Sequence, residues 1–282
     1  DDVAITHTDT WEWNGSDWHL IATSGPGARA VAAFQFDFAN GCPVLFGGMG
    51  GRAQSSLRYR DMWRLMNGEW QQMQVAPLPP ALSGAMFCSD PDRGEIVLQG
   101  GWDVVPINEC WIWSGTAWRS APTRGFFEHS ASAYDPMRRR IVAFGGVVNG
   151  NRVDETWEWS GSAWIRRTPG SSPSARSGSA MVFDPQIGRM MLFGGQLQDP
   201  MGRVDEVWEY FHFALSSYDP FGQGCPGSNA QPPSLRNRRG QLPWVGEVWN
   251  LEVEGIPASV VNVCFGLIGD SRTSANGLPL PL

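Results

Sequence analysis

The stretch Ile141-Val142-Ala143-Phe144-Gly145-Gly146, followed by Glu155-Thr156-Trp157, decides the fold, because variants of both pieces recur along the 282-residue chain. Apolar segments that end on a glycine pair lie at 44–48, 96–101, 141–146 and 190–195. An acidic residue two positions before a tryptophan recurs as Asp9 and Trp11, Asp61 and Trp63, Glu109 and Trp111, Glu155 and Trp157, and Glu206 and Trp208. The spacing of roughly 46 to 52 residues between copies indicates a repeat architecture.

Each copy has the same internal order of landmarks. An aspartate stands ten residues before the first glycine of every pair, at Asp37, Asp90, Asp135 and Asp184. Proline follows three of these aspartates, which marks a turn after a strand. In four copies a second tryptophan stands seven positions after the first, at Trp18, Trp70, Trp118 and Trp164, and Leu215 takes that place in the last copy. We predict four short strands per unit, the pattern of a β-propeller blade.

These landmarks resemble the Kelch repeat, and the resemblance covers about residues 5–215. It departs from the family pattern in one respect, since Trp replaces the usual Tyr on the third strand throughout. The resemblance implies an all-β fold: a Kelch-type β-propeller of the galactose oxidase-like superfamily, with four complete four-stranded blades plus a half blade. Residues 5–23 form the half blade, because they supply a third and a fourth strand with no first or second strand before them. A five-bladed ring closed by a C-terminal strand and a chain lacking upstream blades both remain open.

The composition changes after residue 215, so we predict a propeller domain at 1–215 and a small C-terminal β domain at 216–282. A Gly-Cys-Pro-Gly sequence at 224–227 precedes apolar stretches at 244–253 and 259–268. This tract resembles the first half of a β-sandwich-like module found in secreted bacterial proteins, so we expect the chain to stop before the module ends. An alternative is a decayed blade, because Glu247-Val248-Trp249 repeats the acidic residue and tryptophan, although no glycine pair precedes it.

The charge balance limits the partners. The 21 basic residues, all arginine, stand against 28 acidic residues and give a net charge of −7, so we expect no nucleic acid partner. The absence of lysine excludes Schiff-base chemistry and the P-loop lysine. The sequence contains no run of about 18 apolar residues, so we expect no membrane span. The chain begins at Asp1 without a charged apolar leader, which fits a mature exported protein or a fragment, and we expect a secreted or cell-surface protein.

The cysteines and histidines do not form a metal-binding pattern. The five cysteines lack CxxC spacing and the chain has only four histidines, so we expect no metal and no cofactor. We predict that Cys225 and Cys264 form a disulfide within the last module, in agreement with export. Cys88 and Cys110 fall on predicted strands, where they are interpreted as buried thiols.

The repeated residues are interpreted as structural. A metal ring built from the five acidic residues is the alternative, but a residue present in every blade is expected to serve the blade by accepting backbone or arginine hydrogen bonds. The registered tryptophans are expected in the core between blades rather than as sugar-stacking platforms. The glycine pairs are expected to adopt positive φ and to pack closely near the hub.

The candidate ligand-binding residues lie outside this repeated pattern. Loops between the second and third strands, at 49–60, 102–108, 147–154 and 196–205, vary between copies, and rigid scaffolds tend to carry function on such loops. His129, beside Glu128, stands where other copies have Val31, Gly84 and Gly178, and is the best candidate for acid–base work; a turn histidine is the alternative. The full candidate set is Arg52, Arg58, Trp102, Asp103, His129, Arg152 and Arg203.

We predict no catalytic residue and a binding or scaffolding role, in which the blade loops recognise a glycan or protein partner at the cell surface. Solvated loop charge without a ligand is the structural alternative. A carbohydrate-active or copper-radical oxidase is the other function considered, because galactose oxidase has a Kelch propeller. That chemistry requires a Tyr crosslinked to Cys, a second Tyr and two His, and the four Tyr and four His of this chain occur in dissimilar places.

Overall fold

The computed structural model describes residues 7–50, 57–125, 127–198 and 202–211, together with the backbone of four short strands beyond them. The chain divides into two compact units, Asp1–Phe211 and His212–Leu282. The predicted domain boundary after residue 215 falls outside the described residues.

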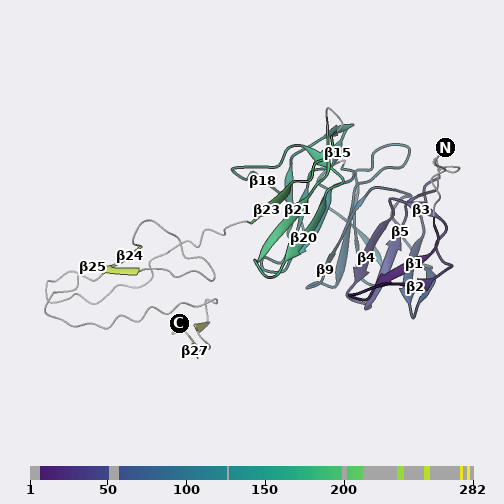
Figure 1. The fold of residues 1–282 in the computed structure, drawn as a ribbon, viewed down its shortest axis with the longest axis horizontal. Coiled ribbons are helices and arrows are strands. Elements are labelled where there is room, and N and C mark those ends of the chain that lie inside the picture. Colours follow the sequence, from purple (N-terminus) through teal and green to yellow (C-terminus); the bar gives the residue numbers. More distant parts are fainter. Residues whose placement is uncertain are drawn as a thin grey trace. The chain divides into compact units, whose positions relative to one another are not determined.

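The first unit is an all-β, four-bladed β-propeller-like arrangement (Figure 1). Three sheets have four antiparallel strands each, and the last has three. The first blade comprises β4 (Ala33–Asp37), β5 (Cys42–Phe46), β7 (Met62–Met66) and β8 (Glu69–Met73). The second comprises β9 (Met86–Asp90), β10 (Glu95–Gln99), β11 (Cys110–Trp113) and β12 (Trp118–Ala121). The third comprises β13 (Ala131–Asp135), β14 (Arg140–Phe144), β17 (Thr156–Trp159) and β18 (Trp164–Arg167), and the fourth β20 (Ala180–Asp184), β21 (Arg189–Phe193) and β23 (Val207–Tyr210).

Shorter strand pairs complete this unit. The residues predicted to supply the two strands of a half blade form a hairpin of β1 (Thr10–Trp13) and β2 (Trp18–Ala22). The fourth strand predicted for the last blade, near Leu215, falls outside the described residues. Three two-stranded pairs involve the loops between the second and third strands of the blades: β3 (Arg29–Ala30) with β6 (Met49–Gly50), β15 (Val147–Val148) with β16 (Asn151–Arg152), and β19 (Arg176–Ser177) with β22 (Gln196–Leu197).

The first strands of successive blades meet one another: β4 contacts β9, β9 contacts β13, and β13 contacts β20. The described residues form no helix, and so include none long and apolar enough to cross a membrane.

The glycine pairs join neighbouring blades, a role in addition to the predicted positive φ and close packing. All eight glycines have positive φ, a conformation that glycine adopts without strain. The first glycine of each pair donates its N–H to the acidic repeat residue's carbonyl, as in Gly100 to Glu109 at 2.9 Å. The second donates to a carbonyl before the next blade's first strand, as in Gly101 to Phe127 at 2.8 Å. Gly48 and Gly146 repeat this bond, but Gly195 of the fourth blade has no such acceptor among the described residues.

A chain of backbone hydrogen bonds connects the four residues that the sequence placed in equivalent positions, here called the hub residues: Val31, Gly84, His129 and Gly178. Gly84 N–H donates to Val31 O, His129 N–H to Gly84 O, and Gly178 N–H to His129 O, at 2.8 to 3.1 Å. All four have φ between 52° and 66°. Within the described ranges, Val31 N–H and Gly178 O make no backbone hydrogen bond, so the chain of bonds has two open ends.

The repeated carboxylates bond the indole two residues later. Trp11, Trp63, Trp111, Trp157 and Trp208 each donate Nε1–H to the preceding acidic residue at 2.7 or 2.8 Å. The structural interpretation is therefore confirmed, but the donor common to all five is tryptophan. Arginine adds to this bond in three copies, through Arg29 on Asp61, Arg166 on Glu155 and Arg176 on Glu206.

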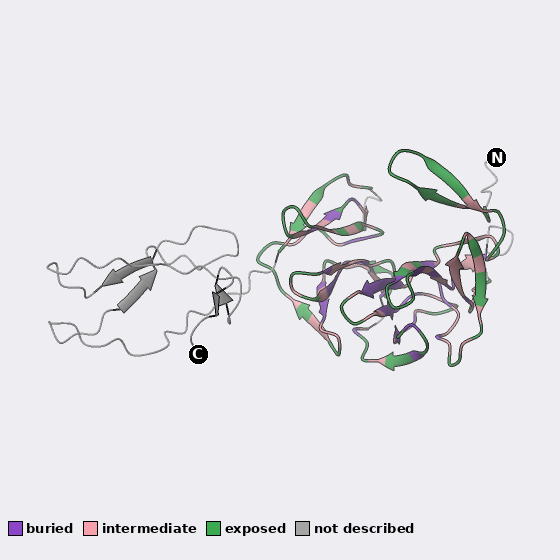
Figure 2. Cartoon of the chain, turned by 90° about the horizontal axis from the view of Figure 1, so that it is seen from below, coloured by how far each residue is buried: buried purple, intermediate pink, exposed green. Residues whose placement is uncertain are grey.

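The apolar cores lie between adjacent blades and are mostly buried, whereas the hairpin next to the N-terminus is largely exposed (Figure 2). The prediction that the registered tryptophans form this core is only partly correct. Trp111 and Trp157 are half-buried, because their indoles reach out to the carboxylates. Trp118 is buried in the core, as predicted, and the fully buried rings are Trp113 and Trp159, two positions further along the strands of Trp111 and Trp157.

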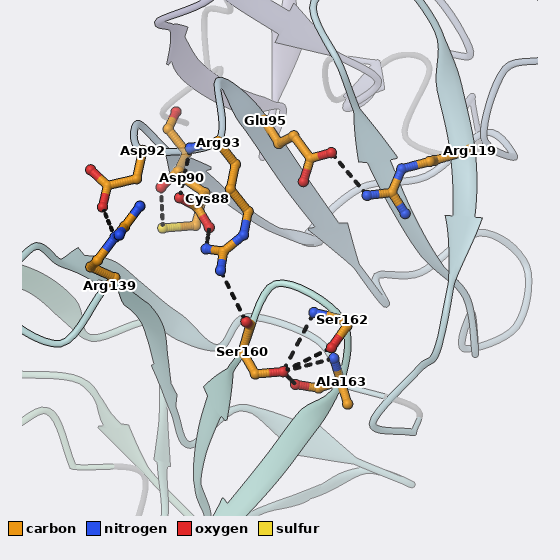
Figure 3. A network of polar contacts seen from close by, with 11 residues as sticks. Cys88, Asp90, Asp92, Arg93, Glu95, Arg119, Arg139, Ser160, Ser162 and Ala163 are labelled. Carbon is orange, nitrogen blue, oxygen red and sulfur yellow. Dashed lines mark hydrogen bonds and ion pairs between the residues drawn. The ribbon is translucent and has the colours of Figure 1, made fainter.

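Polar contacts tie the outer turns of the second and third blades together (Figure 3). Arg93 donates to Asp90 at 2.7 Å and to the carbonyl of Ser160 at 3.2 Å. Asp92 pairs with Arg139 across the same boundary. The repeated aspartates thus cap their own turns, and one turn arginine also reaches the next blade.

The second unit is described only as two antiparallel strand pairs. β24 (Ser234–Asn237) pairs with β25 (Leu251–Glu254), and β26 (Ser274–Ala275) pairs with β27 (Leu278–Pro279). β25 overlaps the apolar stretch predicted at 244–253, and the stretch at 259–268 lies outside the described residues.

Candidate functional site

A cavity of about 660 Å³ lies where the third and fourth blades meet, near the hub. It brings together three of the seven predicted ligand-binding residues: His129, Arg152 and Arg203. The other lining residues are apolar or uncharged: Val147, Ser177, Gly178, Ala180, Phe193, Gly194, Gly195, Gln196 and Val204. Among the described residues, the lining thus contains two guanidinium groups and no carboxylate.

Arg152 is held in place at one side of its guanidinium. It lies on β16, within the loop between the second and third strands of its blade, and is half-buried. Its Nε–H donates to Ser177 Oγ at 3.0 Å, and its backbone N–H donates to Gln198 Oε1 at 2.8 Å. Its terminal nitrogens make no hydrogen bond with the described part of the chain, so they are available to a ligand.

Arg203 comes from the corresponding loop of the fourth blade. A bridge between Gln196 and Arg203 fixes its backbone. The side chain is exposed and makes no hydrogen bond or ion pair within the described ranges. Arg203 and Arg152 thus offer unpaired donors to one cavity from two different blades.

His129 lies at the hub side of the cavity. Its backbone is fixed by the hub hydrogen bonds, and its ring lies against Gly84, where an added Cβ would meet the ring at 2.7 Å. Removal of water from the ring and the nearby charge of Arg152 lower the pKa of His129, so its imidazole is neutral at pH 7. Burial raises the pKa of its neighbour Glu128. The neutral ring can donate one hydrogen bond and accept another.

The other predicted site residues lie elsewhere. Trp102 and Asp103 follow the glycine pair of the second blade and do not line the cavity. Trp102 is half-buried, because its backbone bridges to Ser83 and Pro106 and holds the loop against the blade. Arg58 bridges to Met49 on the first blade, and Arg52 lies outside the described residues.

Sequence reasoning missed Ser177 and Phe193 as cavity residues. Both belong to the repeated pattern, Ser177 just before a hub residue and Phe193 just before a glycine pair. The residue types therefore indicated a structural role and no ligand contact. Its position in the repeat could have identified Ser177 as a cavity residue, because it immediately precedes Gly178, the equivalent of His129.

A second cavity, of about 560 Å³, lies between β2 and the turn that joins β7 to β8. Leu20, Ala22, Gly68, Glu69 and Trp70 are among its lining residues. Glu69 is the only charged group among its described lining residues, so this lining shows no cluster of donors like that of the first cavity.

The three described cysteines are free and buried, as interpreted for Cys88 and Cys110. Burial raises the pKa of Cys88 to about 12 and that of Cys110 to about 11, and burial with the charge of Asp37 raises the pKa of Cys42. We expect none of these thiols to react with Ellman's reagent in the native protein, because the thiolate is the nucleophile. Unfolding in guanidinium should release all three.

The same measurement tests the predicted disulfide, whose Cys225 and Cys264 lie outside the described residues. Three thiols in the unfolded, unreduced protein are expected, and reduction should raise the count to five. Five thiols before reduction would contradict the pairing.

No group of three histidine, cysteine or acidic side chains able to hold a metal occurs in the described ranges. Comparison with known proteins gives no relative from which a role could be transferred: no family model matches the chain, and no curated protein matches it.

Proposed function

We propose that this protein is a non-catalytic, secreted or cell-surface binding propeller of the Kelch type, and that it recognises a glycan carrying carboxylate or sulfate groups through its blade loops. The observation that supports the proposal is the cavity with Arg152, Arg203 and His129 in its lining and no carboxylate among its described lining residues. The cavity is cationic in a protein whose net charge is −7.

The chemistry of the lining favours an oxyanion. Guanidinium groups bind carboxylate and sulfate through paired N–H donors, and both arginines have unused nitrogens. Neutral His129 and Gln196 can bond the hydroxyl groups of a sugar, and Phe193 offers an apolar ring. A site with two cations and a few polar groups suits an acidic sugar better than a neutral one.

Arg203→Gln is expected to weaken binding of an acidic glycan about 10- to 100-fold, because a hydrogen bond to a charged group contributes about 1.5–3 kcal/mol. The measurement is isothermal titration calorimetry with oligouronates or sulfated oligosaccharides found on a glycan array. Arg152→Gln should weaken binding similarly. Arg119→Gln is the matched control, because Arg119 is exposed and paired with Glu95 away from the cavity, and should leave affinity unchanged.

Affinity should also fall as salt rises, since exposed charges are screened. Equal binding of neutral and acidic glycans, or equal affinity of Arg203→Gln and wild type, would overturn the proposal. If the propeller binds an acidic protein but no glycan, the partner is a protein and not a glycan.

A further inference from the structure

The two ends of the blade series carry complementary apolar faces that have no neighbour among the described residues. We call the side of each blade that packs on the next blade its forward face, represented in the fourth blade by Val182, Phe193 and Val207. The opposite side is the rear face, represented in the hairpin by Trp13 and Trp18. Every internal boundary of the propeller joins one forward face to one rear face.

The forward face is buried in three blades and exposed in the fourth. Phe46, Gln99 and Phe144 occupy one position of the repeat and are 0%, 0% and 4% exposed, whereas Phe193 in the same position is 54% exposed. Met62, Cys110 and Thr156 are likewise buried, whereas their equivalent Val207 is 60% exposed. The fourth blade therefore presents the same kind of surface that the other three cover.

The rear face shows the converse at the hairpin. Trp113 and Trp159 are fully buried, and their equivalent Trp13 is 51% exposed. Trp118 is 3% exposed, and its equivalent Trp18 is 63% exposed. At the first internal boundary, Phe46 and Trp118 pack with ring centroids 5.6 Å apart. The corresponding residues of the two unpaired faces are Phe193 and Trp18.

We infer that this protein self-associates head to tail, with the forward face of the fourth blade of one copy covering the rear face of the β1–β2 hairpin of a second copy. Each copy carries both halves of a contact that the fold already makes three times, so a second copy is the occupant that the structure itself specifies. An interface between different patches gives a closed ring if its rotation closes, and otherwise a chain. Contiguous exposed apolar surface of this kind marks an association site.

The test is the mass of the full chain by light scattering after size exclusion over a wide concentration range. Wild type is expected to exceed the mass of one chain and to grow with concentration. Val182→Glu and Trp18→Glu should each elute as a monomer. Val182 does not line the candidate cavity, so this loss is separate from glycan binding, which Arg203→Gln tests. Val104→Glu and Met137→Glu, at exposed apolar residues on neither face, should assemble like wild type.

Mixing the two monomeric variants distinguishes head-to-tail contact from nonspecific hydrophobic association. Val182→Glu retains an intact hairpin and Trp18→Glu an intact fourth blade, so the mixture should form heterodimers that stop at two chains. Trp13→Glu and Val207→Glu, which lie on the same two faces and do not line the candidate cavity, repeat the test if either first variant loses its native circular dichroism. A wild type that stays monomeric, variants that assemble unchanged, or monomeric variants that fail to pair would each overturn the inference.

Discussion

Glu158→Gln is expected to destabilise the propeller by about 3–5 kcal/mol, because it removes the charge of a buried carboxylate from an ion-pair network. The Glu158 side chain is 1% exposed and pairs with Arg138. It also accepts hydrogen bonds from Arg167 at 2.8 Å and from Tyr210 of the fourth blade at 2.9 Å. Glutamine keeps the shape but leaves two arginines without their shared carboxylate. Urea unfolding followed by tryptophan fluorescence measures the loss.

The pH dependence of this effect has a defined sign. Burial alone raises the pKa of Glu158, but the charge of Arg138 and the hydrogen bonds from Arg167, Arg138 and Tyr210 outweigh it and lower the pKa. A carboxyl whose pKa is lower in the folded state stabilises the fold above its unfolded pKa, near 4.5, and loses that contribution as the pH falls through the folded pKa. The difference between wild type and Glu158→Gln should therefore be largest near neutral pH and shrink in acid.

Glu209→Gln is the matched control, because Glu209 occupies the position of Glu158 in the fourth blade, three residues after the repeated acidic residue. It pairs with Arg189, but both side chains are about 40% exposed. A surface pair contributes about 0–1 kcal/mol. Equal losses from the two substitutions would show that burial of the Glu158 network carries no special weight.

Gly100→Ala is expected to cost about 3 kcal/mol or more, from strained backbone together with a clash between blades. Gly100 has a φ of 69°, and a Cβ there would lie 2.0 Å from the carbonyl oxygen of Phe127. That oxygen accepts the hydrogen bond from Gly101, so relieving the clash breaks the bond that joins the second and third blades. Thermal unfolding by circular dichroism, combined with urea titration, gives the change in the free energy of unfolding.

Gly188→Ala separates backbone strain from the clash. Gly188 has a nearly identical φ of 65°, but a Cβ at this turn meets nothing within 4 Å. Its expected cost is the left-handed backbone penalty alone, about 1–2 kcal/mol. If Gly188→Ala cost as much as Gly100→Ala, the contact with Phe127 would not be the reason for the glycine pair.

The repeated residues made the blade pattern predictable, because a strand that must end against a neighbouring blade needs the same glycine pair every time. The arginine partners predicted for the repeated carboxylates are confirmed in three copies, whereas the indole donor common to all five was missed although it was accessible from sequence. Residues two apart in an extended chain point to the same side, so the spacing of Glu155 and Trp157 already places the two groups together.

The cavity and the open faces could not be read in the same way. Phe193 follows the pattern of Phe46, and nothing in its type shows that one ring is covered and the other exposed. That difference depends on whether another described blade packs against the ring, a property that the type of the residue does not carry. His129 stood out only because its side chain broke the pattern, although its backbone role is the same as that of Gly84.

The way the blades are joined at the hub bears on how such a protein can evolve. Each indole–carboxylate pair closes within three residues, so a duplicated blade carries that contact with it. The hub bonds are made by main-chain atoms, and valine, glycine and histidine all serve in them. If recombination duplicates or deletes the gene segment for one blade, the blades that become neighbours can therefore still form the same hub hydrogen bonds. A side chain with acid–base chemistry, such as that of His129, could then be introduced at one hub position without a change at the other three.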